Sequence, residues 1–578
     1  MIVRFAIAAA FTLALTACGD DPAPPAPTAD PALSRAVTGG EIIGYVDAGA
    51  GAHVWLGVPF AAAPDGANRW RAPQPVAPWR TARETITHAE PCPQITNALN
   101  AEATGTEPGA LAGSEDCLYL DVYAPASPQP EEAGRPVMVW IHGGANVWGS
   151  ADQYDAAQLA EDQDVVVVVV QYRLGPLGFF SHPALEGENL VADGDSAPNR
   201  SGAANFALLD QIAALEWVQE NAPAFGGDAA NVTIFGESAG GHNVAGLLAS
   251  PLAGGLFHRA IIQSGLTDVV SVADARDGSD VAAIPASRRF TGADDPAAAD
   301  LRAAPVQAVY DAYVGDDGLR DMPRMIADGV TIPEAGLIAA LSSPETFNAV
   351  PVITGTNRDE MKLFNILDPE LSSRWFGVII RTPDPDFFEA ASEYQTRLWR
   401  ALAVDEVAQT LTQGGHEDVY AYRFDWDEGG TMAFMDLDRL LGAAHAMEIP
   451  FVFNHFDFFG RLDSTLFNAG NAEGREALAQ SMGAYWAEFA RSGDPNAAGG
   501  PDWPQWSENG AALRFDTPSD GGIEVMELRE TLEAIAEDLA ADDRLTADQR
   551  CFIFERLVTW RSSVTELGTP LDCPQPET

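Results

Sequence analysis

The sequence predicts an α/β protein with a mostly parallel central sheet flanked by helices. Val165 to Val170 is a run of six valines, which is typical of a strand buried on both faces of a parallel sheet. Short apolar runs alternate with helical patterns, which implies right-handed crossovers between parallel strands. A serine flanked by glycines stands between one such strand and the helical pattern after it.

The elements before this turn follow from local patterns. Residues 36–60 alternate and contain turn glycines, so they predict short N-terminal strands, whereas 61–116 is rich in Pro, Ala and Gly and predicts mostly loop. Val137 to Ile141 is a short apolar strand. Asn205 to Asn221 carries apolar residues at mostly helical spacing, and Gly226-Gly227-Asp228 ends that region.

The later elements complete one domain over residues 36–578. Residues 266–345 are Ala- and Asp-rich with weak periodicity, and we expect helical excursions and loops that build a lid or pocket wall. We see no internal repeat and no clean linker. The other predicted elements are strands at Val232 to Phe235, Arg259 to Gln263, Ala349 to Thr354 and Val419 to Phe424, and helices up to Ser250 and over Arg475 to Arg491.

The N-terminus has the pattern of a signal peptide. The apolar run from Phe5 to Ala17 is too short to span a membrane. Leu15-Thr16-Ala17-Cys18 resembles a bacterial lipoprotein cleavage box, which implies removal of residues 1–17 and lipidation of Cys18. A Pro-rich tether over 18–35 would then link an exported protein, facing the periplasm or cell exterior, to a membrane. An ordinary secretory signal with an incidental cysteine is the alternative.

The charge balance excludes one class of partner. The net charge is −51, and nucleic-acid binding needs clustered Lys and Arg, so we expect no nucleic-acid partner. Lys362 is the only lysine. Coding bias with a solubilising surface and adaptation to salt both explain this composition.

Four cysteines remain besides Cys18: Cys92, Cys117, Cys551 and Cys573. An even number in an exported protein indicates two disulfides, and three pairings are conceivable. The sequence-local pairing, Cys92–Cys117 and Cys551–Cys573, closes short loops that would each stabilise by roughly 3 kcal/mol in the chain-entropy model. A metal site is the rival interpretation, but no Cys-x-x-Cys spacing supports it.

The strongest chemical signal is Gly236-Glu237-Ser238-Ala239-Gly240, a G-x-S-x-G pentapeptide between a strand and a helical pattern. The glycines permit a sharp turn that exposes Ser238, as in the nucleophile elbow of the α/β-hydrolase fold. The helix N-terminus directs partial positive charge toward the reaction centre.

A serine nucleophile needs a base, and nine histidines are available. In α/β-hydrolases the base follows the acid late in the chain, which leaves His445 and His455. The pattern alone does not choose between them.

A second glycine element, Ile141 to Gly149, follows a predicted strand and contains His142-Gly143-Gly144. It matches the HGGG-type loop whose small residues let backbone N–H groups approach a developing oxyanion. An ordinary tight turn is the structural alternative.

The chain resembles the type-B carboxylesterases, the family that includes cholinesterases and bacterial para-nitrobenzyl esterases. The resemblance spans about residues 40 to 560. It rests on these ordered motifs: Gly57-Val58-Pro59-Phe60, Ser114 to Tyr123, Tyr172-Arg173-Leu174-Gly175, Asn205 with Leu209-Asp210-Gln211, Phe225-Gly226-Gly227-Asp228 and Gln263-Ser264-Gly265.

The resemblance implies a serine ester hydrolase of the α/β-hydrolase fold that needs no cofactor and no metal. Gly355 to Glu360 looks like the acid segment, which favours Glu360 over its neighbour Asp359, and Gly442 to Glu448 looks like the base segment, which favours His445. By the same mapping the oxyanion hole consists of the backbone N–H groups of Gly144, Ala145 and Ala239. Ser264 and Glu237 support the triad, and Cys92–Cys117 is the family's loop disulfide.

The implied substrate is a small or medium carboxylic ester. An amidase, thioesterase or lactonase on the same scaffold is the alternative, because fold does not fix substrate, and a non-catalytic binding protein is disfavoured by the complete triad. The sequence departs from relatives at Asn146, where many carry an aromatic residue, and at Met361, where a glycine is usual. The loop between Cys92 and Cys117 lacks Trp, Tyr and Phe, so a choline ester is a poor guess.

Overall fold

The computed structural model describes residues 26–97, 100, 105–128, 134–187, 200, 202–314, 321–375, 379–432, 434–496, 499–560 and 573. The predicted signal peptide, Cys18 and the tether as far as residue 25 lie outside the described residues.

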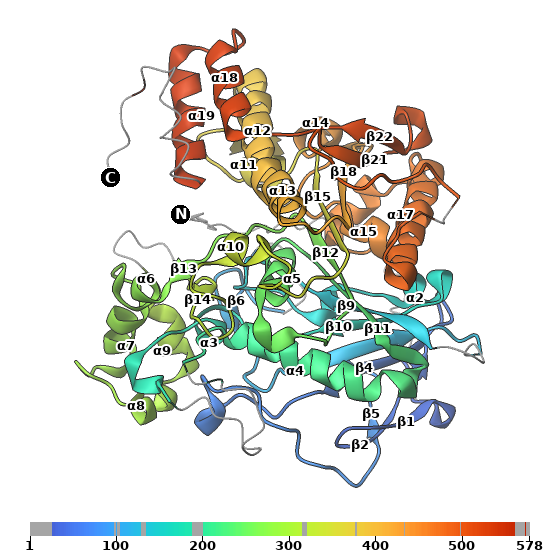
Figure 1. Cartoon of the computed structure of the whole chain (residues 1–578), viewed down its shortest axis with the longest axis vertical. Coiled ribbons are helices and arrows are strands. Elements are labelled where there is room, and N and C mark those ends of the chain that lie inside the picture. The colour runs from blue at the N-terminus through green and yellow to red at the C-terminus, as the bar shows by residue number, and fades with distance from the viewer. Residues whose placement is uncertain are drawn as a thin grey trace.

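Within this part of the chain, the core is an eleven-stranded sheet of order β22-β21-β18-β15-β12-β11-β9-β10-β8-β4-β3 (Figure 1). The middle strands from β21 to β10 pair in parallel, and the strands at both edges pair antiparallel. The predicted mostly parallel sheet is therefore confirmed. The bounds are β3 Tyr45–Val46, β4 His53–Pro59, β8 Tyr119–Ala124, β9 Arg135–Ile141, β10 Val166–Val170, β11 Gly227–Glu237, β12 Arg259–Gln263, β15 Val352–Asn357, β18 Val419–Phe424, β21 Ala511–Phe515 and β22 Glu524–Glu527.

Helices cover both faces of this sheet (Figure 1). On one face lie α4 Phe206–Asn221, α5 Ala239–Ala249 and α13 Glu406–Gln413, and on the other lie α2 Ala157–Gln163, α15 Ile449–Phe453 and α17 Ala472–Ser492. The remaining helices are α3 Gly175–Gly178, α6 Val272–Asp277, α7 Ala283–Thr291, α8 Ala298–Ala303, α9 Val306–Asp311, α10 Leu337–Leu341, α11 Lys362–Asn365, α12 Pro385–Arg400, α14 Leu437–Leu440, α16 Asp463–Leu466, α18 Leu532–Ala541 and α19 Ala547–Trp560.

Short strands lie outside the main sheet. They are β1 Ser34–Val37, β2 Gly40–Ile43, β5 Arg83–Glu84, β6 Gln94–Ile95, β7 Leu111–Ala112, β13 Val270–Ser271, β14 Ile326–Ala327, β16 Ser373–Trp375, β17 Ile379–Arg381, β19 Thr431–Met432 and β20 Met435–Asp436. Helices α6 to α10 occupy the Ala- and Asp-rich region at one side of the molecule, so the helical excursions expected there are present (Figure 1). No helix in the described ranges is both long and apolar enough to cross a membrane.

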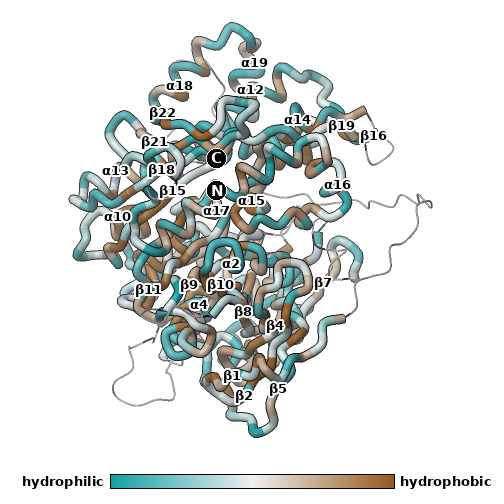
Figure 2. The backbone as a smooth tube through the Cα atoms, turned by 90° about the vertical axis from the view of Figure 1, so that its right-hand side faces the viewer, coloured by the Kyte–Doolittle hydropathy of each residue, from teal (hydrophilic) through white to brown (hydrophobic). Residues whose placement is uncertain are grey.

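The valine strand β10 shows why the sheet is buried on both faces. Val166, Val168 and Val170 pack into the core beneath α4 and α5, whereas Val167 and Val169 pack into the core beneath α2 and α17. Side chains alternate along a strand, so a continuous apolar run supplies both cores at once. Hydrophobic segments accordingly run through the centre of the molecule around β9 and β10 (Figure 2).

Several boundaries differ from the sequence prediction by a few residues, and two of these differences have a clear physical reason. Strand β15 begins at Val352 rather than at Ala349, because Pro351 has no N–H to donate to the sheet. The folded part also includes residues 31–35, which the sequence assigned to the tether: the carbonyl of Leu33 accepts a 2.9 Å hydrogen bond from Trp55 Nε1, and β1 begins at Ser34.

Both sequence-local disulfides are present, Cys92–Cys117 and Cys551–Cys573. Of the three conceivable pairings, this one is confirmed. The first bridge is buried, since Cys92 and Cys117 are 2% and 0% exposed.

A buried ion pair connects the segment after β10 to helix α4. Arg173 Nε and Nη2 donate to the two carboxylate oxygens of Asp210 at 2.8 and 2.6 Å, and the backbone N–H of Arg173 adds a third bond at 3.0 Å. Both side chains are at most 2% exposed. Two of the sequence motifs thus meet in one bidentate contact.

Asp210→Asn should lower the free energy of unfolding by about 3–5 kcal/mol, because it leaves the Arg173 charge buried without a counter-charge. Urea unfolding measures this. Asp268→Asn is the matched control, because its pair with Arg324 is 3.3 Å long and its side chains are 56% and 39% exposed. The control should cost less than about 1 kcal/mol. Equal effects of the two substitutions would contradict the role given to burial.

Candidate active site

Ser238 lies at the turn between β11 and α5, with φ 57° and ψ −120°. A Cβ on Gly240 would come within 1.9 Å of the Ile141 carbonyl oxygen, and one on Gly236 within 2.5 Å of the same atom. Both positions therefore require glycine, because the turn packs directly on the end of β9. The N–H of Ser238 donates to the Gln263 carbonyl at 2.8 Å, which fixes the turn against β12.

A buried histidine–glutamate pair lies beside this turn. His445 Nδ1 donates to Glu360 Oε2 at 2.5 Å, and this bond leaves Nε2 as the nitrogen that can accept a proton. Glu360 is 0% exposed. Its Oε1 accepts bonds from Ser264 Oγ at 2.6 Å and from the Asn357 N–H at 2.8 Å. The structure thus brings two of the predicted site residues, His445 and Ser264, into direct contact with a third, Glu360.

The alternatives left open by the sequence have other partners. Asp359 accepts a bond from the Ala443 N–H at 3.1 Å and returns one from its own N–H to the Ala443 carbonyl at 2.9 Å. It therefore holds the backbone of the loop that carries His445 rather than the imidazole. His455 follows the end of α15 and donates its backbone N–H to the Pro450 carbonyl.

Glu237 approaches the other nitrogen of the same imidazole. Its Oε1 lies 3.1 Å from His445 Nε2, although the orientation is not that of a hydrogen bond. Ser238 and His445 are both described, and no hydrogen bond joins them in this structure. Catalytic hydrogen bonds are often loose before substrate binds, so the geometry is compatible with proton transfer from Ser238.

The carboxylates control the charge of the histidine. Burial lowers the pKa of His445, but Glu237 and Glu360 outweigh burial and raise that pKa to about 9. Burial raises the pKa of Glu237 well above its usual range. Glu237 and Glu360 both lie close to one imidazole, so the protonation of Glu237 and of His445 is coupled. Nε2 of His445 can act as a base only when it carries no proton.

The glycine-rich loop Gly143 to Gly149 lies against Ser238. A Cβ on Gly143 would come within 3.3 Å of Ser238 Cβ and 2.9 Å of the Glu237 carbonyl oxygen. Gly144, Ala145 and Asn146 follow with φ of 98°, 56° and 59°. Among the described residues, none accepts a hydrogen bond from the backbone N–H of Gly144, Ala145 or Ala239. These donors are free to bind an oxyanion near Ser238.

His142 anchors the start of this loop. Tyr172 Oη donates to its carbonyl at 2.6 Å, and its ring stacks on the Tyr172 ring at 4.4 Å between centroids. Burial lowers the pKa of His142 to about 4, so it remains neutral at physiological pH. This histidine supports the loop and does not serve as the base.

The two departures from the family pattern are both buried. Asn146 is 5% exposed, and its Oδ1 accepts a 2.8 Å bond from Asn243 Nδ2 on α5. Met361 is 5% exposed, and its N–H donates to Thr396 Oγ1 at 3.0 Å. The polar amide at 146 therefore links the glycine-rich loop to the helix that follows the serine.

Several site residues were missed from the sequence. Asn357 Nδ2 donates to the Ala444 carbonyl and to Glu448 Oε2, at 2.8 and 2.6 Å, so it joins the acid segment to the base segment. The rings of Trp399 and Phe364 lie 4.8 and 5.1 Å from the His445 ring. Asn357 and Glu448 stand inside the recognised motifs, whereas no sequence signal pointed to Trp399. In the described part of the chain, no cluster of His, Cys, Asp and Glu has the geometry of a metal site.

A serine at a strained strand–helix turn of a mostly parallel sheet, beside a buried His–Glu pair, defines a serine hydrolase of the α/β-hydrolase fold. Comparison with known proteins gives the family. The carboxylesterase family model matches residues 32–376 and 381–533, so the chain belongs to the carboxylesterase family.

Individual relatives agree with this assignment. The chain is 34% identical over 487 residues to human carboxylesterase 3, covering 79% of this chain and 81% of that protein. It is 32% identical over 481 residues to para-nitrobenzyl esterase of Bacillus subtilis (strain 168), covering 79% and 90%. The solved structure of a thermophilic PNB esterase superposes with a TM-score of 0.67 at 28% identity, covering 85% of this chain and 97% of that one. The protein is a serine carboxylic-ester hydrolase.

Glu237→Gln should move the rise of kcat/KM to lower pH. As the predicted base, His445 works only when its Nε2 is unprotonated, and the Glu237 carboxylate raises the His445 pKa. Removing that carboxylate brings the pKa closer to its ordinary value near 6.5. The pH profile of ester hydrolysis measures the shift.

Glu524→Gln, on the exposed edge strand β22, is the control and should leave the profile unchanged. An unshifted profile for Glu237→Gln would mean that Glu237 is already protonated in the working enzyme.

Proposed function

We propose that Ser238, His445 and Glu360 form the catalytic triad. The observation that carries this proposal is the 2.5 Å bond from His445 Nδ1 to Glu360 Oε2 beside the strained turn at Ser238. This bond fixes the imidazole tautomer and leaves Nε2, which lies 3.1 Å from Oε1 of the adjacent Glu237, as the nitrogen that can accept the Ser238 proton. Glu360 also stabilises the imidazolium that forms during the reaction.

The reaction proceeds in two half-reactions. His445 Nε2 takes the proton of Ser238 Oγ while Oγ attacks the ester carbonyl carbon. The tetrahedral intermediate collapses, the alkoxide leaves with the proton from His445, and an acyl-enzyme remains. Water then loses a proton to His445 and attacks the acyl carbon, which releases the acid and restores the Ser238 hydroxyl.

The backbone N–H groups of Gly144, Ala145 and Ala239 bind the oxyanion in both half-reactions. Ala239 is the first residue of α5, so its N–H has no acceptor within the helix and lies at the positive end of the helix dipole. Losing one such donor typically costs about 3–4 kcal/mol of transition-state stabilisation.

The substrate class is a small or medium carboxylic ester. The rings of Trp399 and Phe364 lie against the His445 ring and add apolar surface beside it, which suits an uncharged ester. Neither ring discriminates an ester from a thioester or lactone, so these acyl substrates have to be compared directly.

Ser238→Ala should lower kcat for para-nitrophenyl ester hydrolysis by about 10⁶-fold, because the remaining groups cannot form an acyl-enzyme. Esters of graded chain length, with matched amide, thioester and lactone substrates, define the specificity of the wild type. Turnover of the variant near the wild-type rate would overturn the triad.

We also propose that the protein is exported and anchored through a lipid on Cys18, with residues 1–17 removed. The sequence pattern carries this proposal. It is supported by the start of the family match at residue 32, which lies after the predicted cleavage site.

Cys18→Ser should move the protein from the membrane fraction to the soluble fraction, because a side chain without a thiol cannot accept the thioether-linked lipid. Fractionation of the expressing cells and the mass of the N-terminal peptide measure this. Equal membrane association of wild type and variant would argue against the anchor.

A further inference from the structure

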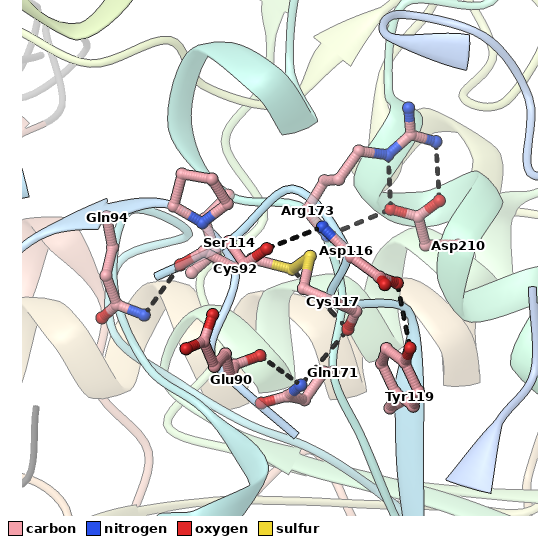
Figure 3. The surroundings of a disulfide bond; sticks show 12 residues. Glu90, Cys92, Gln94, Ser114, Asp116, Cys117, Tyr119, Gln171, Arg173 and Asp210 are labelled. Atoms are coloured by element: carbon pink, nitrogen blue, oxygen red, sulfur yellow. Dashed lines mark hydrogen bonds and ion pairs between the residues drawn. A yellow bond between two sulfur atoms is a disulfide. The ribbon is translucent and has the colours of Figure 1, made fainter. Parts of the chain in front are cut away.

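The buried side chain of Gln94 connects the first disulfide to the glycine-rich loop. Figure 3 shows the disulfide and the bond from Gln94 to the Cys92 carbonyl. Gln94 Nε2 donates to the Gly149 carbonyl at 3.0 Å, and Gln94 Oε1 accepts from the Gly149 N–H at 2.9 Å. The remaining donor bonds the Cys92 carbonyl at 3.1 Å, and the remaining lone pair accepts from Asn100 Nδ2 at 2.8 Å. The side chain is 1% exposed, and its amide is fully used.

Gly149 is the end of the loop whose beginning supplies the oxyanion donors. With φ 119°, it packs so closely that a Cβ would meet Gly143 O at 2.8 Å. Inside the loop, the N–H groups of Val147 and Trp148 both donate to the Gly144 carbonyl, at 2.9 and 3.1 Å. The loop is therefore a closed turn, so a displacement of Gly149 moves Gly144 and the next residue with it.

The disulfide determines where Gln94 can lie. Cys92 is bonded to Cys117, which lies just before β8. The Cys117 carbonyl accepts from the Tyr119 N–H at 2.9 Å and, as Figure 3 shows, from Gln171 Nε2 at 3.2 Å. Gln171 also donates to the Glu90 carbonyl at 3.2 Å, on the other side of Cys92. The segment that carries Gln94 is thus fixed to the residues just before β8 and just after β10 of the main sheet.

We propose that Gln94 is a positioning residue for the oxyanion hole, and that the Cys92–Cys117 disulfide maintains its position. The inference rests on the proposed function, because it assigns the loop's N–H groups to the oxyanion. Those donors must lie about 2.7–3.1 Å from the oxyanion, and a misplacement of about 1 Å can cost 10²-fold in rate. Gln94 touches no reacting atom and acts through Gly149.

A second buried amide offers a matched control. Asn205 Nδ2 donates to the Ile326 carbonyl at 2.7 Å, and Asn205 Oδ1 accepts from the Ile326 N–H at 2.8 Å. Asn205 is 0% exposed. It makes the same two-bond contact with a backbone as Gln94 does, but with strand β14 instead of the oxyanion loop.

The test compares Gln94→Met with Asn205→Leu in the full chain. We expect Gln94→Met to lower kcat by about 10- to 100-fold with KM little changed, and to weaken inhibition by an ester-like trifluoromethyl ketone by a similar factor. Asn205→Leu should lower the thermal midpoint without changing kcat or the inhibition constant. Gln94→Glu, which retains the shape and one acceptor, replaces Gln94→Met if that variant does not fold.

Unchanged kcat and inhibition in a folded Gln94 variant would overturn the inference, as would equal kinetic losses in both variants. In either case the proposed function stands if the wild type hydrolyses esters and the Ser238→Ala variant does not. A folded wild type without ester turnover would overturn the proposed function, and this inference with it.

The disulfide is tested by the pair Cys92→Ala/Cys117→Ala against Cys551→Ala/Cys573→Ala. The first double variant should reproduce the kinetic loss of Gln94→Met, whereas the second should retain the wild-type kcat. Wild-type inhibition by the trifluoromethyl ketone in the first variant would contradict the role of the disulfide.

Discussion

The close contact between the end of β9 and the serine turn is the constraint on which the site depends. The Ile141 carbonyl lies where a Cβ of Gly236 or Gly240 would stand, so the chain must turn sharply at Ser238. The same contact brings the residues after Ile141 against the nucleophile, with Gly143 next to the Ser238 side chain. The proposed nucleophile and the proposed oxyanion loop are therefore positioned by one close backbone contact, which only glycine permits.

Buried charge is the second determinant of the site. Glu237, Glu360 and Glu448 are each at most 3% exposed, and a lone carboxylate in such surroundings would be costly. Glu360 is compensated by hydrogen bonds from Ser264, Asn357 and His445. Burial instead raises the pKa of Glu237 and of Glu448. In the proposed triad, these different surroundings let Glu360 orient His445, whereas Glu237 and Glu448 modulate the charge of that histidine.

The local sequence pattern predicted the strands, the helices and the serine turn. The contacts between site residues depend on segments that are distant in sequence. The valines of β10 and the turn at Ser238 could be predicted because each is specified within a few residues. The choice of Glu360 over Asp359, and of His445 over His455, needed the family resemblance, because both candidates fit the spacing. The approach of Glu237 to His445 and the contact of Gln94 with Gly149 join segments distant in sequence, so no periodicity could reveal them.

Backbone strain is concentrated where the chemistry occurs. In the described ranges, nine non-glycine residues have positive φ, and five of them belong to the site: Ala145, Asn146, Ser238, Ser264 and Ala446. Such conformations cost of order 1–3 kcal/mol each and persist only where the surroundings enforce them. Here the enforcing bonds come from rigid elements, as from Trp399 Nε1 to the Ser264 carbonyl and from the Ser238 N–H to the Gln263 carbonyl. The sheet and its helices thus hold the donors and the nucleophile in place before substrate arrives, so little reorganisation is required in the transition state.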